Sequence, residues 1–169
     1  MPSDAASRAI AEEALRLNRL RPRKLTPAEI DAEKKRCKED LIYFIRTYCK
    51  IYDNITASWI AFDLWPEQIA ALKAMEGHKY ILQPKARQNG ATWMEAARVQ
   101  WKMVFWPIRE VLIFSQRDDE AIKLLERLRG MYERLPDWMK PGVKTDSAHE
   151  LQLVNGSRVQ ALPATTGGR

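Results

Sequence analysis

Residues 79–92 read KYILQPKARQNGAT, and this stretch decides the fold that we predict. Its first five residues, 79–83, form a short apolar run that is typical of a buried β-strand. Residues 84–90 hold a proline, a glycine and polar side chains, which favour a loop. From Thr92 to Phe105 the apolar residues recur at helical spacing. We therefore predict a strand, a loop and a helix in direct succession.

The loop before this helix partly matches the phosphate-binding motif G-x-x-x-x-G-K-[ST]. Gly90 and Thr92 fill its second glycine and its hydroxyl position, whereas Lys85 and Ala91 replace its first glycine and its lysine. Backbone N–H groups at the start of a helix attract phosphate, and a threonine hydroxyl is suited to hold Mg²⁺ between phosphates. Lys85 or Arg87 would supply the missing positive charge. The alternative is an ordinary strand-to-helix turn with two surface cations.

The segments after this helix extend the pattern into a sheet. Residues 110–115 (EVLIFS) predict a second strand that is buried and apolar on both faces, as parallel strands are. Asp118 is expected to cap a helix that reaches about Arg134. Residues 151–162 predict a β-hairpin, because Asn155-Gly156 separates two alternating segments.

The order strand, loop, helix, strand, helix is a βαβα unit. It predicts an α/β fold with a parallel sheet and right-handed crossovers. Ligands bind such sheets at the carboxyl ends of the strands, and the loop at 84–91 lies at such an end. This loop is therefore the candidate ligand site.

Helices are predicted near the N-terminus. Residues 4–20 predict a first helix, which Pro22 breaks. Thr26 and Glu29 form a capping box that starts a second helix, and this helix is expected to run to about Lys50.

Two further segments lead from these helices to the first strand. Residues 51–65 are expected to form a loop with large aromatic side chains. Pro66 then opens a short helix that reaches about Met75, and Gly77 ends it.

Composition excludes several other classes of protein. The chain has a net charge of +6 and no apolar run of the roughly 18–20 residues that a membrane span needs. Cys37 and Cys49, without a secretory signal pattern, indicate reduced structural thiols. His78 and His149 are isolated in the sequence, which argues against a metal centre.

Four motifs, in order along the chain, resemble the large subunit of phage terminases. In that family the lysine of the phosphate loop is often displaced to its start, and an Arg-Gln pair precedes the glycine, as in residues 85–93 (KARQNGATW). The other motifs are 65–68 (WPEQ), 114–118 (FSQRD) with 135–138 (LPDW), and 156–164 leading into 167–169. The resemblance covers about residues 40–169.

The resemblance implies a role for each matching position. Gln68 would hydrogen-bond the adenine of ATP. Lys85 would contact the phosphates, and Arg87 would sense or stabilise the γ-phosphate. These two and Thr92 would be the catalytic residues. The remaining loop positions would cradle the phosphates, with Thr92 also holding Mg²⁺: Ala86, Gln88, Asn89, Gly90, Ala91 and Thr92.

The resemblance also implies an architecture, a P-loop NTPase of the RecA-like (ASCE) class with a partial parallel sheet and flanking helices. Residues 1–50 would be a helical N-terminal arm, and residues 51–169 the N-terminal half of the ATPase domain. The strand ending in Asp-Glu that hydrolysis needs, and an RNase H-like nuclease domain, are expected after Arg169. Alone, this segment is expected to bind ATP but to turn it over poorly.

The implied function is a DNA-packaging ATPase that moves double-stranded viral DNA into a procapsid, in the host cytoplasm. Its implied partners are DNA, a small terminase subunit, a portal protein and other copies in a ring, with no membrane. One alternative is a helicase-like P-loop ATPase. Another is a non-catalytic basic module that binds nucleic acid or a partner subunit. The basic run from Arg16 to Lys24 suits phosphates, although a solvated helix end explains it equally well.

Overall fold

The computed structural model describes residues 25–78, 80–82 and 90–164. Contacts within the chain divide it into two units, Met1–Asp31 and Ala32–Arg169. The division into a helical arm, 1–50, and part of an ATPase domain, 51–169, remains a prediction.

The capping box near the N-terminus forms as predicted. The Thr26 N–H donates to Glu29 Oε2 over 2.8 Å, and the Glu29 N–H donates to Thr26 Oγ1 over 3.3 Å. Helix α2 (Pro27–Glu39) starts there. The helix predicted at 4–20 and its break at Pro22 lie outside the described residues.

The prediction that this helix continues to Lys50 is wrong, because a second helix, α3 (Leu41–Tyr48), begins after Asp40. The Asp40 carboxylate accepts a hydrogen bond from the Tyr43 N–H over 2.8 Å, so it caps a new helix. Helix α3 is amphipathic and buries Phe44 and Ile45 completely. It therefore belongs to the core of the larger unit.

The predicted loop at 51–65 contains a β-hairpin that the sequence analysis missed. Strands β1 (Lys50–Asp53) and β2 (Ser58–Ala61) pair antiparallel. The Asp53 carboxylate closes their turn by accepting from the N–H groups of Ile55 and Thr56. Helix α4 (Pro66–Ala74) follows close to its predicted position.

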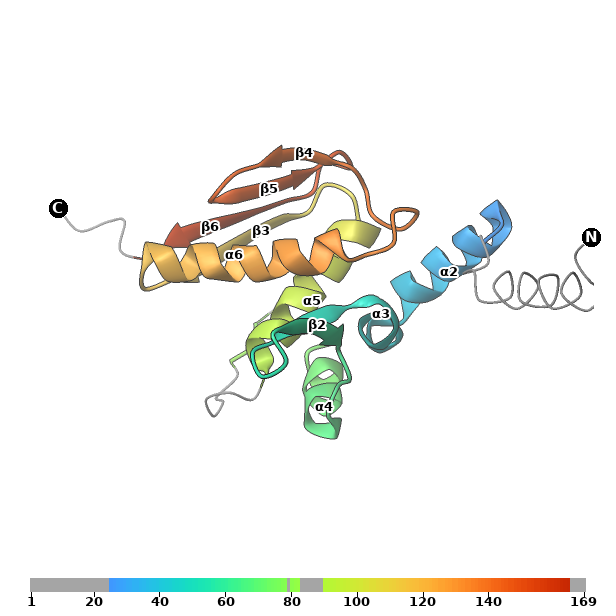
Figure 1. Cartoon of the computed structure of the whole chain (residues 1–169), viewed down its shortest axis with the longest axis horizontal. Helices are drawn as coiled ribbons and strands as arrows, with labels where there is room; N and C mark the ends of the chain where they lie inside the picture. The colour runs from blue at the N-terminus through green and yellow to red at the C-terminus, as the bar shows by residue number, and fades with distance from the viewer. Residues whose placement is uncertain (1–24, 79, 83–89, 165–169) are drawn as a thin grey trace, which may run out of the picture. The chain divides into compact units, whose positions relative to one another are not determined.

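The main sheet has four strands in the order β3-β6-β5-β4 (Figure 1). Their bounds are β3 (Glu110–Ser115), β4 (Val143–Asp146), β5 (Glu150–Leu153) and β6 (Arg158–Pro163). Strands β3 and β6 are parallel, with Glu110 opposite Arg158, and the other two pairings are antiparallel. The predicted hairpin at Asn155-Gly156 is confirmed as β5–β6, and Gly156 adopts the positive φ of 84° that such a turn requires. The sheet is thus mixed, and the prediction of a parallel sheet is correct only for β3 and β6 among the described strands, because the tight turn at Asn155-Gly156 makes β5 and β6 antiparallel.

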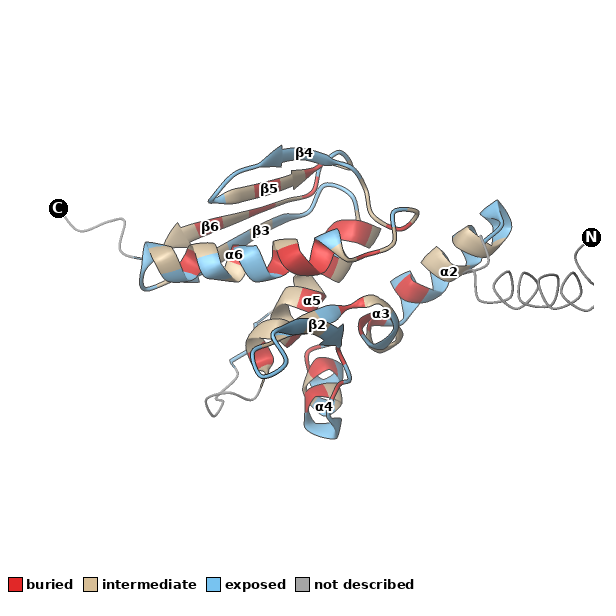
Figure 2. Ribbon diagram, viewed as in Figure 1, coloured by how far each residue is buried: buried red, intermediate tan, exposed pale blue. Residues whose placement is uncertain are grey.

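One face of this sheet is buried against helix α6 (Asp118–Glu133). Alternate residues of β5 and β6 point into the core, where four of them are almost completely buried: Leu151, Leu153, Val159 and Ala161. Figure 2 shows this alternation as red positions separated by tan ones along β5 and β6. Helix α5 (Ala91–Phe105) packs against α6.

The burial of strand β3 differs from the prediction. The sequence analysis expected both of its faces to be covered. Strand β3 has the predicted bounds and a parallel neighbour, but Leu112 is 48% exposed and Phe114 is 59% exposed. Among the described residues β3 pairs with β6 alone, so one of its edges has no strand beside it.

The strand predicted at 79–83 is not present in its described part. Residues 80–82 have no strand pairing, and the side chain of Leu82 is 95% exposed. An apolar run forms a strand only where a neighbouring strand satisfies its backbone groups, and none lies beside residues 80–82 in the part that the structure describes. Positions 79 and 83 lie outside the described residues.

No helix in the described part of the chain combines the length and apolar character that crossing a bilayer requires.

Candidate phosphate-binding site

The site is built around Gly90, the residue that precedes helix α5. Gly90 has φ +73° and ψ 3°, a left-handed conformation that glycine adopts without steric cost. Its carbonyl accepts the hydrogen bond from the Met94 N–H over 3.1 Å, so the chain turns directly into the helix. A residue with a Cβ atom would be strained at this position.

Gln68 lies against Gly90, although the two residues are far apart in the sequence. An ideal Cβ atom built on Gly90 would lie only 2.6 Å from Gln68 Nε2. Gln68 is 7% exposed, and its Oε1 accepts a hydrogen bond from the Trp65 N–H over 3.0 Å. This bond fixes the amide at the start of α4. The structure therefore brings together two of the predicted site residues.

The first turn of α5 favours an anion. Gly90 carries no side chain to cap the helix, and the first turn holds no acidic residue. The positive end of the helix dipole is therefore not offset by a carboxylate from that turn. Ala91 is buried in this turn, whereas Thr92 is partly exposed.

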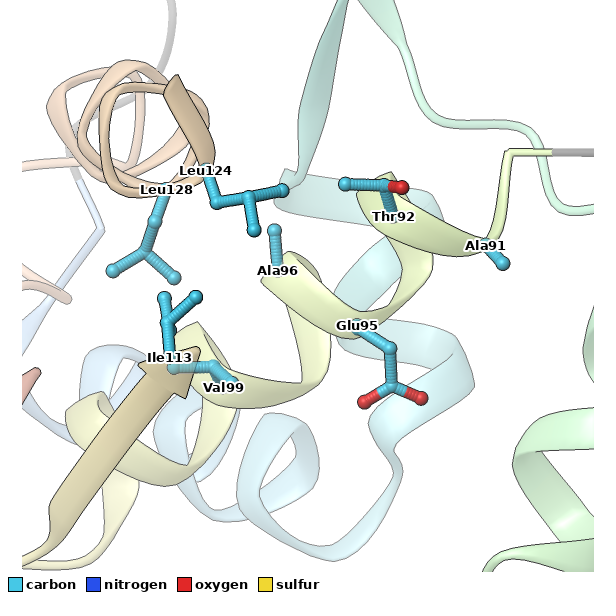
Figure 3. Close-up of a pocket in the computed structure, with 8 residues that line it drawn as sticks. All are labelled: Ala91, Thr92, Glu95, Ala96, Val99, Ile113, Leu124 and Leu128. Carbon is cyan, nitrogen blue, oxygen red and sulfur yellow. The ribbon is translucent and has the colours of Figure 1, made fainter. Parts of the chain in front are cut away.

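A cavity of about 250 Å³ adjoins this turn, between α5, α6 and β3. Its lining is mainly apolar: Ala91, Thr92, Glu95, Ala96, Val99, Ile113, Leu124 and Leu128. Figure 3 shows the side chains of Leu124, Leu128 and Ile113 gathered together, with the Glu95 carboxylate directed away from them. Glu95 instead pairs with Arg98 over 2.9 Å. This apolar lining does not suit phosphate, so the start of α5, and not the cavity, remains the candidate phosphate site.

Polar groups at the carboxyl end of β3 are paired with one another. Ser115 Oγ donates to Glu120 over 2.9 Å, and Asp118 lies 3.0 Å from His149 Nε2. The prediction that Asp118 caps α6 is wrong, because Asp118 is the first helical residue and Arg117 takes the capping position without a side-chain bond. His149, isolated in the sequence, thus has a carboxylate partner in the fold.

The cationic half of the predicted site lies outside the described residues. This half comprises Lys85 and Arg87, together with Ala86, Gln88 and Asn89. In the part of the chain that the structure describes, no group of three His, Cys, Asp or Glu side chains is arranged to hold a metal ion. Thr92 remains the predicted Mg²⁺ contact.

No model of a known protein family matches this chain. Among solved structures, the crystal structure of the HK97 bacteriophage large terminase is similar, with a TM-score of 0.60 over 78% of this chain. The chain has a terminase-like fold. The two sequences are 18% identical, and the match spans 28% of the HK97 protein. At this identity the likeness shows the fold alone.

The terminase-like fold agrees, at the level of the fold alone, with the family that the sequence motifs resemble. The sequence analysis did not find the apolar cavity beside Thr92, because its lining comes from three successive elements whose packing determines where space is left. Periodicity marks Leu124 and Leu128 as core residues, but it does not show where the core leaves a gap.

Proposed function

We propose that this chain is the ATP-binding part of a DNA-packaging motor of the large terminase type. The contact between Gln68 and Gly90 carries the proposal, since it joins the predicted adenine contact to the end of the predicted phosphate loop. Because this contact occurs in a terminase-like fold, we interpret it as part of a nucleotide site. The double-stranded DNA substrate, the small subunit, the portal protein and the homo-oligomeric ring belong to this proposal as well.

The chemistry of the described residues around Gly90 suits a nucleoside triphosphate. Gly90 allows close approach of the backbone to a phosphate, and the N-terminus of α5 favours its charge. Thr92 has a hydroxyl in the first turn, where it would hold Mg²⁺. Lys85 and Arg87 would supply the cations that the first turn itself lacks. When bound, ATP would provide the phosphoanhydride bond whose hydrolysis drives movement of DNA.

Gln68 would have two functions in this site. Its Oε1 accepts a hydrogen bond from the Trp65 N–H, and its Nε2 lies next to Gly90. A glutamine in this position would hydrogen-bond adenine and would also position the end of the phosphate loop. Binding of adenine to Gln68 would thereby affect the geometry around the phosphates.

The test is nucleotide binding by Lys85→Ala and Arg87→Ala, measured with a fluorescent ATP analogue in the presence of Mg²⁺. We expect at least one of them to weaken binding by roughly tenfold or more, because a hydrogen bond to a charged group contributes about 1.5–3 kcal/mol. Lys73→Ala is the matched control, since Lys73 is an exposed lysine at the end of α4. If both loop variants bind the analogue as the parent does, the proposal is wrong.

A further inference from the structure

A cationic pocket lies where helix α5 ends and strand β3 begins. It has a volume of about 330 Å³ and is lined by Trp101, Lys102, Trp106, Arg109, Glu110 and Val111. Lys102 is ten residues beyond Thr92 on the same helix, which places it about 15 Å along the axis at a rise of 1.5 Å per residue. The pocket is therefore separate from the proposed nucleotide site.

The segment that carries Trp106 and Arg109 is held in place by the β5–β6 turn. The Ser157 hydroxyl is fully buried, donates to the Trp106 carbonyl over 3.0 Å and accepts from the Arg109 N–H over 3.3 Å. The Ile108 N–H donates to the Asn155 carbonyl over 3.2 Å. Ile108 has φ +57°, a conformation that is rare for a β-branched residue, and its side chain is exposed. These bonds hold the segment in a shape that the free chain would avoid.

The floor of the pocket is aromatic and equally well fixed. Trp101 donates its Nε1–H to the Cys37 carbonyl over 2.7 Å. The rings of Trp101 and Trp106 meet edge to face, with centroids 4.3 Å apart. Lys38 Nζ lies 5.5 Å from the centroid of Trp106, which adds a third cation from another helix. An apolar floor strengthens the attraction between these cations and an anion, because it lowers the local dielectric.

Lys102 and Arg109 lie outside ion-pair distance of every carboxylate among the described residues, although the charge of Glu95 acts weakly on Lys102. Within the described part of the chain, neither side chain forms an ion pair or a hydrogen bond. The carboxylate of Glu110 also lines the pocket, but it pairs with Arg158. Burial, followed by the charges of Arg98 and Arg109, lowers the pKa of Lys102. Such mutual repulsion is relieved when an anion binds between the cations.

We propose that this pocket binds the phosphate backbone of a nucleic-acid strand. Three cations, from α2, α5 and the segment before β3, surround one aromatic floor, and such a concentration of positive charge suits a polyanion such as a nucleic-acid strand. The pocket needs no nucleotide at the start of α5. It would therefore bind nucleic acid even if the proposed ATPase function failed.

The experiment is binding of a fluorescein-labelled DNA duplex of 20 base pairs to the full chain, measured by anisotropy over a range of salt concentrations. We expect Lys102→Met/Arg109→Met to weaken binding by roughly tenfold or more. We also expect the slope of log K against log salt to fall by about 2, since each phosphate contact contributes about 0.9. Lys102→Arg/Arg109→Lys keeps both charges and should retain binding.

The control is Lys73→Met/Lys144→Met, which removes the same charge from two exposed lysines outside the pocket. The thermal midpoint and the binding of the ATP analogue should be unchanged in the pocket variant, which separates this proposal from the previous one. The proposal is overturned if the parent does not bind the duplex. It is also overturned if the pocket variant binds within twofold of the control variant.

Discussion

At the scale of single residues, Gly90 carries two constraints at once. Its φ of +73° disfavours any residue with a side chain, and its Cα faces the amide of Gln68. Gly77 carries only the first constraint, because it has φ +74° but no atom within 4 Å of an added Cβ. The two glycines therefore form a matched pair.

We predict that Gly90→Ala reduces the free energy of unfolding by more than Gly77→Ala does. Each substitution should cost about 1–2 kcal/mol for the left-handed backbone. Gly90→Ala must also shift the Gln68 amide, whose Nε2 would lie 2.6 Å from the added Cβ atom, and we expect it alone to weaken binding of the ATP analogue. Urea unfolding and analogue titration measure both effects. Equal losses in the two variants would show that the Gln68 contact has no energetic role.

The thiols illustrate a residue-scale prediction from sequence that the structure supports. Cys37 and Cys49 are both free and buried. Burial raises the pKa of the Cys37 thiol to about 12, and it raises the pKa of Cys49 as well. Protonated, buried thiols are poor nucleophiles, which agrees with a structural role.

At the scale of elements, helices α2 and α3 are joined by Glu33. Its Oε1 accepts hydrogen bonds from the Tyr43 hydroxyl over 2.6 Å and from the Tyr48 hydroxyl over 2.8 Å. The bond from Tyr43 is the largest influence, and together with that from Tyr48 it lowers the pKa of Glu33, although burial acts in the opposite direction. The folded state thus prefers the charged carboxylate more than the unfolded chain does.

This preference predicts a pH dependence. A carboxyl group whose folded pKa is lowered stabilises the fold fully above its unfolded pKa, and the contribution is lost as the pH falls through the folded pKa. We expect Glu33→Gln to lower the free energy of unfolding at pH 7 and to lose less stability than the parent below pH 4.5. Glu126→Gln, an exposed site on α6, is the control. Parallel pH profiles of parent and Glu33→Gln would contradict the prediction.

Local sequence signals predicted the elements that they control directly. The capping box at Thr26, the helix from Thr92 to Phe105 and the Asn155-Gly156 turn each depend on a few neighbouring residues, and all three form. The break at Asp40 was missed because this aspartate ends a largely charged run, 33–40 (EKKRCKED), in which it does not stand out as a helix cap. The hairpin at 50–61 was missed because its strands are only four residues long.

At the scale of the whole molecule, the contacts between distant segments could not be predicted from local patterns. The sequence does not show that β3 pairs with β6, nor that β3 leaves an edge without a neighbouring strand. Gln68 and Gly90 were assigned to one site only through the family resemblance. Their proximity depends on how α4 and α5 are placed in the fold, which periodicity does not specify.

The exposed face of β3 allows a prediction at this scale. We expect Leu112→Thr/Phe114→Thr to change the free energy of unfolding by less than about 0.5 kcal/mol per site, because both side chains are largely in water. Association of the chain at high concentration should decrease, since an exposed apolar patch is removed. Urea unfolding and sedimentation measure the two quantities.

Leu153→Ala is the control, because Leu153 is completely buried and its truncation should cost about 2–5 kcal/mol. A loss of that size in the Leu112→Thr/Phe114→Thr variant would show that this face of β3 is covered in solution.

The β1–β2 hairpin rests on α6 through Trp59 and Gly130. An ideal Cβ atom on Gly130 would lie 2.4 Å from the Trp59 ring, so the indole fits only because that helix position has no side chain. Glycine is unfavourable within a helix, which means that α6 gives up intrinsic helicity to accommodate the ring. We therefore expect the residues at positions 59 and 130 to vary together among related chains. A lineage that acquires a larger residue at 130 must first, or simultaneously, acquire a smaller one at 59.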